Sequence, residues 1–164
     1  MSPRQWLPVL AMVALLAVAF LPAAAPATPS APDIAGQYRA VRSGMVVTIG
    51  ACDGGRMCGR IVALGDLPPT DANNPAPSLQ ARRLCGATVL DRLEPQSGSW
   101  HGTLYDPQNG TNYRVSVAPA PNGGVRVSGH SGRAVLSRTY LRSVEVWESV
   151  ATPAAGCGSP AVTS

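Results

Sequence analysis

The segment from Tyr113 to Ser128 reads YRVSVAPAPNGGVRVS and decides the fold class. Apolar and polar side chains alternate on both sides of its centre, with the period of two residues that is typical of strands with one buried face. The centre contains Asn122-Gly123-Gly124, residue types that favour the backbone angles of a tight hairpin turn. The segment therefore predicts an antiparallel β-hairpin.

Further β-rich runs precede this hairpin along the chain. They cover residues 44–51, 56–64, 84–93 and 100–104, and turn residues separate them at 53–55, 95–98 and 106–110. Short strands at such spacing are typical of an antiparallel meander in a small sandwich or barrel. We expect an all-β fold, a single small up-and-down β-barrel of about eight strands.

One segment interrupts the meander, between residues 65 and 83. It contains four prolines: Pro68, Pro69, Pro75 and Pro77. Strands do not tolerate that density of proline, because each one removes a backbone donor. We expect a long ordered loop, with one or two helical turns over residues 77–83, that lies as a flap over the mouth of a cavity. A disordered insertion is the alternative.

The N-terminal segment has the three parts of a secretory signal. A short region with one positive charge, Arg4, is followed by an apolar run from Leu7 to Leu21 and then by small residues that include Ala25 and Ala27. The apolar run has 15 residues, whereas a membrane-spanning helix needs about 20, so cleavage is favoured over a membrane anchor. We expect a signal peptide at residues 1–27, export to the periplasm or the extracellular space, and no integral membrane span after cleavage.

The rest of the chain fits one domain between two ends rich in Pro, Ala and Ser. We expect a flexible leader over residues 28–35, the barrel over 36–148 and a flexible tail over 149–164. The formal net charge is +4, and the basic residues, all arginine, are scattered rather than clustered. This pattern does not favour nucleic acid as a partner.

The four cysteines of the chain are Cys52, Cys58, Cys85 and Cys157. In an oxidising compartment an even number predicts two disulfides, for which three connectivities exist. If residues 54–56 form a three-residue hairpin loop, Cys52 faces Cys58 at a separation that a disulfide accepts. By elimination Cys85 then pairs with Cys157 and attaches the tail to the barrel, unless Cys157 pairs between chains.

Candidate catalytic and metal-binding residues are few. Oxygen ligands for a metal could come from Asp71, Asn73, Asp106 and Asn109, which are too few for a calcium loop and are also ordinary turn residues. The two histidines, His101 and His130, stand alone, and the sequence has no G-x-S-x-G motif and no C-x-x-C pair. We expect no metal and no cofactor, and the sequence favours a non-catalytic role.

Several short motifs occur in an order that resembles one bacterial family. They are Gly36-Gln37-Tyr38, Cys52 with Cys58-Gly59-Arg60-Ile61-Val62, Asp71-Ala72-Asn73-Asn74-Pro75, the segment from Leu79 to Leu84, Tyr105-Asp106-Pro107 with Gly110 and Tyr113, and Ser137-Arg138-Thr139-Tyr140-Leu141-Arg142. The chain is similar to the family called domain of unknown function 2147 from residue 36 to about residue 144. The resemblance implies a small secreted protein with a lipocalin-like barrel.

The resemblance also implies how the barrel closes. Lipocalin-like barrels place an aromatic residue of the first strand beneath a basic residue of the last strand, and these positions correspond to Tyr38 and Arg142, with Tyr140 nearby. An arginine can lie flat on an aromatic ring while its stem covers apolar surface. This contact would join the first strand to the last.

Two functions fit such a barrel. The sequence specifies neither the oligomeric state nor the ligand-binding residues, but an eight-stranded barrel is just wide enough to hold one small ligand. The first function is therefore a binding module for a small apolar or amphipathic molecule, and the second is a structural or interaction protein of the cell envelope with a filled barrel. The chain contains a single phenylalanine, and a scarcity of large aromatic residues favours a cavity and the binding module.

Overall fold

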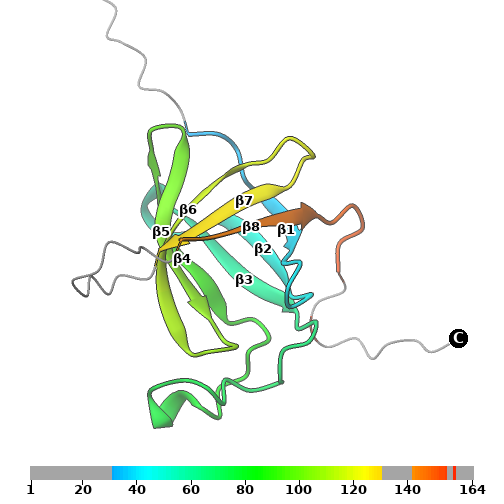
Figure 1. Cartoon of the computed structure of the whole chain (residues 1–164), viewed down its shortest axis with the longest axis vertical. Coiled ribbons are helices and arrows are strands. Elements are labelled where there is room, and N and C mark those ends of the chain that lie inside the picture. The colour runs from blue at the N-terminus through cyan, green and yellow to red at the C-terminus, as the bar shows by residue number, and fades with distance from the viewer. Residues whose placement is uncertain (1–30, 131–141, 155–156, 158–164) are drawn as a thin grey trace, which may run out of the picture.

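Eight antiparallel strands follow one another around a closed barrel in chain order (Figure 1). The computed structural model describes residues 31–130, 142–154 and 157. The strands within these residues are β1 (Gly36–Arg39), β2 (Val46–Ala51), β3 (Met57–Ala63), β4 (Thr88–Gln96), β5 (Ser99–Asp106), β6 (Thr111–Pro119), β7 (Val125–His130) and β8 (Arg142–Ser149). Because β8 pairs back with β1, the predicted all-β, up-and-down barrel of about eight strands is confirmed.

The alternating segment of the sequence forms the hairpin of β6 and β7. Val117 pairs with Val127 and both are buried, whereas Arg114 and Arg126 are exposed. Gly123 in the turn has a φ of +76°, a left-handed conformation that glycine adopts without steric cost. The period of two therefore places one face of each strand inside the barrel.

A bulge in β4 brings two leucines of that strand into the core. The pairing of β4 with β5 shifts register between Asp91 and Glu94, and Arg92 at the shift has a φ of 49°. Leu90 and Leu93 are both completely buried, although residues three apart lie on opposite faces of a regular strand. The bulge thus adds a core side chain that strict alternation would have placed outside.

Residues 31–35 lie against the barrel end that carries the β4–β5 hairpin. Ile34 is buried in the core, and Trp100 Nε1 donates a hydrogen bond to the carbonyl of Pro32 at 2.7 Å. The sequence assigned residues 28–35 to a flexible leader, yet its last residues pack on the barrel because Ile34 is apolar and has a place in the core. The predicted signal peptide lies outside the described residues.

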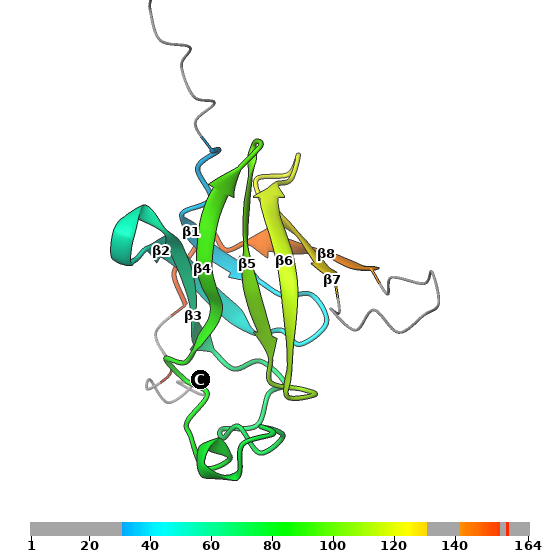
Figure 2. The same cartoon turned by 90° about the vertical axis from the view of Figure 1, so that its left-hand side faces the viewer.

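The loop between β3 and β4 leaves the opposite end of the barrel (Figure 2). Leu84 within it is completely buried, and an isolated β-bridge between Thr70 and Arg83 holds its two arms together. The expected helical segment over residues 77–83 is limited to the 3-10 turn η2 (Pro77–Leu79). None of the helical segments in the described part of the chain has the length and apolarity to cross a membrane.

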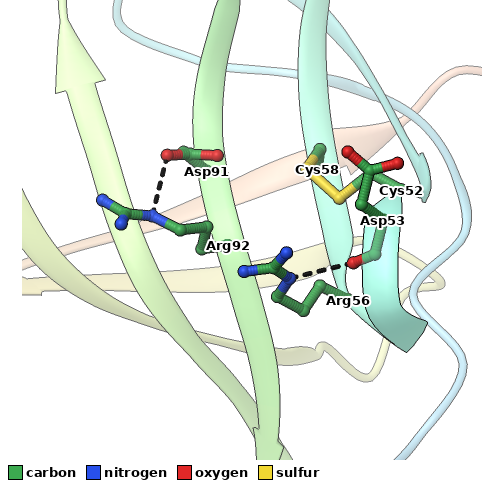
Figure 3. The surroundings of a disulfide bond; sticks show 6 residues. All are labelled: Cys52, Asp53, Arg56, Cys58, Asp91 and Arg92. Carbon is green, nitrogen blue, oxygen red and sulfur yellow. Dashed lines mark hydrogen bonds and ion pairs between the residues drawn. A yellow bond between two sulfur atoms is a disulfide. The ribbon is translucent and has the colours of Figure 1, made fainter.

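Two disulfides join the four cysteines in the expected pairs. Cys52 bonds to Cys58 within the β2–β3 hairpin, with the Cα atoms 5.8 Å apart, and Cys85 bonds to Cys157 with the Cα atoms 5.6 Å apart. Figure 3 shows the first disulfide at the 3-10 turn η1 (Asp53–Gly55). The second disulfide links the long loop to the C-terminal tail.

The β2–β3 hairpin has a longer loop than the sequence suggested. A three-residue loop would place Asp53 opposite Met57, but Ala51 lies there. Gly54 and Gly55 both have positive φ, and they allow η1 to form and to lengthen the loop. The expected register is therefore wrong, although the two cysteines still lie at disulfide distance.

The described part of the C-terminal tail lies along β1. The backbone N–H of Val150 donates to the carbonyl of Gln37 at 2.9 Å, and the backbone N–H of Ala154 donates to the Oε1 atom of the Gln37 side chain at 2.9 Å. Cys157 then reaches Cys85. These contacts attach the start of the tail, which the sequence places at residues 149–164, to both the barrel and the long loop.

The register of β8 separates the backbones of Tyr38 and Arg142. Tyr38 pairs with Ser149 at the end of β8, whereas Arg142 pairs with His130 at its start. A strand rises about 3.3 Å per residue, so the length of β8 separates the two positions by about 23 Å, which an arginine side chain cannot span. The side chain of Arg142 and the whole of Tyr140 lie outside the described residues, and the backbone does not support the closing contact that the resemblance implied.

Candidate functional site

A cavity of about 500 Å³ opens at the barrel end that carries the β1–β2 loop and the β5–β6 turn. The lining residues Met45, Val127 and Trp147 are buried and give the cavity an apolar interior. Gly129 on β7 also lines it, and a Cβ atom added there would meet no atom closer than 3.8 Å. The barrel interior is therefore filled towards the β4–β5 hairpin and hollow towards the opposite end.

The mouth of the cavity carries polar side chains. Asp106, Asn109, Tyr113, Ser143 and Glu145 all line it. Glu145 projects from β8 opposite Val127, and its Oε1 atom accepts a hydrogen bond from the backbone N–H of Arg42 at 2.9 Å. An apolar interior with a few polar groups at the mouth is the arrangement expected of a site for an amphipathic small molecule.

The β5–β6 turn at the mouth is held by its own side chains. Asp106 Oδ1 accepts the backbone N–H of Gln108 at 2.9 Å, and Asn109 Nδ2 donates to Asp106 Oδ2 and to the hydroxyl of Tyr113, both at 2.9 Å. The long loop adds Asn73, whose Nδ2 donates to the carbonyl of Gln108 at 2.9 Å. Asp106, Asn109 and Asn73 thus act as turn residues, and no group of three or more His, Cys, Asp or Glu side chains in the described part of the chain could hold a metal ion.

Asp71, on the long loop, is the centre of a buried polar network. Its side chain is completely buried, and its Oδ2 atom forms an ion pair with Arg82 Nη2 at 2.6 Å. The hydroxyl of Tyr105 donates to Asp71 Oδ1 at 2.5 Å, and Asn74 Nδ2 donates to Asp71 Oδ2 at 2.8 Å. Since Tyr105 belongs to β5 and the other three residues to the loop, the network pins the loop to the barrel.

The network shifts the pKa of both acids in it. Burial alone would raise the pKa of Asp71, but hydrogen bonds from Tyr105, Asn74 and Arg82, together with the charge of Arg82, hold it below its usual value. Burial, and then the hydrogen bond to the Asp71 carboxylate and its charge, raise the pKa of Tyr105 to about 12. The network therefore favours an ionised Asp71 beside a neutral Tyr105.

These shifts predict how stability depends on pH. Because the folded pKa of Asp71 is lowered, its contribution is complete above the unfolded pKa of about 3.9 and is lost as the pH falls through the folded value. We expect Asp71→Asn to lower the free energy of unfolding at pH 7 by about 1–2 kcal/mol, and the difference from the unchanged protein should shrink below pH 4. Urea unfolding of both proteins from pH 7 down to pH 2.5 measures this, and a constant difference would exclude titration of Asp71 as the cause.

The long loop does not cover the cavity mouth, but it contacts residues that form the mouth, Tyr105 and Gln108. No residue between 65 and 83 is among the described residues that line the cavity. The loop is instead linked to the cavity through Tyr105, which lines the cavity and donates a hydrogen bond to Asp71 of the loop. A separate outer groove of about 530 Å³ lies between the loop and β4–β6, with Leu79, Arg82 and Thr103 in its lining. The expected flap does not cover the cavity mouth; the loop lies beside the mouth and is bound to β5 and to the β5–β6 turn.

Of the two histidines, the structure describes the side chain of His101. His101 lies on the exposed surface, where its Nε2 atom is 2.8 Å from Ser99 Oγ, and that hydroxyl also donates to the carbonyl of Gln96 at 3.2 Å. Within the described residues, no hydrogen bond joins the side chain of Ser99 or His101 to an Asp or Glu side chain, although Glu94 pairs with His101 in the β4–β5 ladder. The side chain of His130 lies outside the described residues.

Sequence reasoning missed the cavity residues of β8. Ser143, Glu145 and Trp147 share the inward face of this strand, in the same period of two that identified the β6–β7 hairpin. A carboxylate at an inward position of a strand is unusual enough to mark a site. The pattern was present in the sequence, but it becomes informative only once the strand and its buried face are known.

Comparison with known proteins places the barrel among lipocalin-like folds. A model of the family described as "Uncharacterized protein conserved in bacteria (DUF2147)" matches residues 36–142. A solved structure described as "Protein HP1028 from the human pathogen Helicobacter pylori belongs to the lipocalin family" is similar with a TM-score of 0.60 and 21% sequence identity, over 72% of this chain and 83% of that chain. No curated protein matches the chain. At that identity the structural likeness shows the fold alone.

Proposed function

This chain belongs to the bacterial DUF2147 family, and from its lipocalin-like barrel we propose that it is an exported, non-catalytic binding module for a small apolar or amphipathic ligand. The observation that carries the proposal is the cavity of about 500 Å³ inside the barrel. Small-molecule sites have volumes of about 300–1,000 Å³ and are mostly apolar with a few polar groups. Both properties describe this cavity.

Two features support the exported location. The N-terminal segment has the charged, apolar and small-residue parts of a secretory signal. Both disulfides suit an oxidising compartment, since disulfides persist in the periplasm and outside the cell and are rare in the cytosol. The ligand would therefore be a molecule met in the periplasm or outside the cell.

Native mass spectrometry of the protein recovered after export tests both parts of the proposal. We expect an intact mass that lacks residues 1–27 and a second species that carries a co-purified small molecule. A mass that retains the N-terminal segment would contradict export by cleavage. Protein that carries no small molecule and takes up none from a lipid extract would instead favour the alternative, a structural or interaction protein of the envelope.

Filling the cavity should remove the ligand without unfolding the barrel. Gly129 lines the cavity and has room for a Cβ atom, so Gly129→Leu places a side chain in the ligand's space. We expect the ligand-bound species to fall about tenfold or more, because steric overlap with one side chain costs a few kcal/mol. Native mass spectrometry, with circular dichroism to verify folding, measures the effect.

Gly50→Leu is the matched control. Gly50 is also a strand glycine with no atom within 4 Å of an added Cβ, but it is not among the lining residues of the cavity. We expect this variant to retain the ligand. Equal retention by the Gly129→Leu and Gly50→Leu variants would place the ligand outside the barrel and contradict the proposal.

A further inference from the structure

The tip of the β6–β7 hairpin carries an asparagine followed by a glycine, Asn122 and Gly123. Both residues are exposed, and the side chain of Asn122 forms no hydrogen bond in the described part of the chain. A Cβ atom added at Gly123 would meet no atom within 4 Å. The backbone N–H of Gly123 donates to the carbonyl of Ala120 at 3.2 Å. The side chain of Asn122 therefore has room to turn towards the backbone of Gly123.

The β5–β6 turn contains the same pair of residue types, Asn109 and Gly110, but holds it differently. Asn109 is also exposed, whereas Gly110 is buried. The Nδ2 atom of Asn109 donates to Asp106 Oδ2 and to the hydroxyl of Tyr113, both at 2.9 Å. Its Oδ1 atom accepts the backbone N–H of Thr111 at 3.0 Å. Three hydrogen bonds thus fix this side chain in place.

The packing of the two glycines adds to the contrast. A Cβ atom added at Gly110 would overlap the carbonyl oxygen of Asn73 in the long loop, so that this part of the turn has no open space. The backbone N–H of Gly110 donates to the carbonyl of Asp106 at 2.9 Å, as that of Gly123 does to Ala120. The two glycine N–H groups are therefore bonded alike, and the difference lies in the asparagine side chains and in the space around the turns.

Asparagine is a thermolabile residue, and a following glycine exposes its own backbone nitrogen because it has no Cβ atom. That nitrogen attacks the Cγ atom of the asparagine, a new C–N bond forms, and the C–N bond of the side-chain amide breaks. The proton of the backbone nitrogen leaves with the amide nitrogen as ammonia. Water then opens the resulting succinimide ring at either carbonyl, and the product is aspartate or isoaspartate with one new negative charge.

We infer that Asn122 is a site of spontaneous deamidation in the folded protein, and that the fold protects Asn109 from the same reaction. Asn122 reaches the attacking geometry by a rotation of its side chain, whereas Asn109 must first break its three hydrogen bonds. The ladder of β6 and β7 begins at Pro119 and Val125, outside the reacting pair, so the barrel accommodates the product. This modification is independent of the proposed cavity function.

Peptide mapping of the folded, exported protein during incubation at mildly alkaline pH tests the inference. Because the chain contains no lysine, trypsin cleaves it after arginine alone. The peptide of residues 115–126 contains Asn122 and no other amide side chain, and the peptide of residues 93–114 contains Asn109. We expect the first to acquire the mass of the deamidated form about tenfold or more faster than Asn109 does, because the hydrogen bonds of Asn109 must break first.

The same protein, reduced and unfolded in urea, is the control. Without the fold the two Asn-Gly pairs should react at similar rates. The inference is wrong if the ratio of the two rates is the same in folded and unfolded protein, or if folded Asn122 stays unchanged while both residues react in urea. Asn122→Gln should remove the mass change from the peptide of residues 115–126, since glutamine would have to close a larger ring, and a mass change that persists in this variant would also overturn the assignment.

Discussion

Removing the Cys85–Cys157 disulfide by the double substitution Cys85→Ser and Cys157→Ser should lower the free energy of unfolding by about 4 kcal/mol. The two cysteines are 72 residues apart in the sequence, and in the chain-entropy model a cross-link stabilises a protein more when it closes a longer loop of the unfolded chain. Cys157 also packs against the hydrophobic core, so the substitution loses apolar contact as well. Urea unfolding at pH 7 measures the difference.

The Cys52–Cys58 disulfide provides the control. Its cysteines are 6 residues apart, and the same model gives about 2 kcal/mol for so short a loop. The double substitution Cys52→Ser and Cys58→Ser should therefore cost about half as much. Equal losses in the two variants would show that loop length does not determine the stabilisation, and a disulfide-linked dimer on a gel without reductant would contradict the Cys85–Cys157 pairing itself.

The strand pattern of this protein could be predicted from its sequence, but the departures from a regular strand could not. The β6–β7 hairpin follows directly from alternation around Asn122-Gly123-Gly124. Leu90 and Leu93 follow no such pattern, because the bulge in β4 turns both into the core. A bulge is decided by pairing with the neighbouring strand, and that information is not local in the sequence.

The same reason explains the other differences. Ile34 lies in a segment of Pro, Ala and Asp that reads as a loose leader, and its burial depends on a core formed mostly by residues that follow it in the chain. The separation of Tyr38 from Arg142 follows from the register of β8 on β1 and β7. Register between strands distant in the sequence is fixed by packing, so neither composition nor the family resemblance could supply it.

The candidate site was the least predictable part. The sequence marked Asp71 as a turn residue, and nothing local indicates that Tyr105, 34 residues later, donates to it. Likewise, the cavity combines residues of the β1–β2 loop, β5, β7 and β8. Single residues of the site were visible in the sequence, but their convergence is a property of the closed barrel.

Asp71→Ala should destabilise the protein by about 2–3 kcal/mol. Breaking a buried ion pair by removing one partner typically costs about 3–5 kcal/mol, and the value here is reduced because the Arg82 side chain is 38% exposed and water can solvate it. The hydroxyl of Tyr105 and the amide of Asn74 also lose their acceptor on Asp71, and unpaired buried polar groups add to the loss. Urea unfolding at pH 7 measures the change.

Asp91→Ala removes the other Asp–Arg ion pair of the described residues and is the matched control. Asp91 and Arg92 are 49% and 67% exposed, and Figure 3 shows the pair on the outside of β4. Exposed pairs contribute about 0–1 kcal/mol, so this variant should unfold close to the unchanged protein. Both variants lose a carboxylate paired with an arginine, so the difference between them measures what burial and the hydrogen bonds from Tyr105 and Asn74 add to such a pair. If Asp71→Ala costs no more than Asp91→Ala, the long loop is not held by its buried carboxylate, and the cavity mouth must be positioned by other contacts, such as that of Asn73 with the β5–β6 turn.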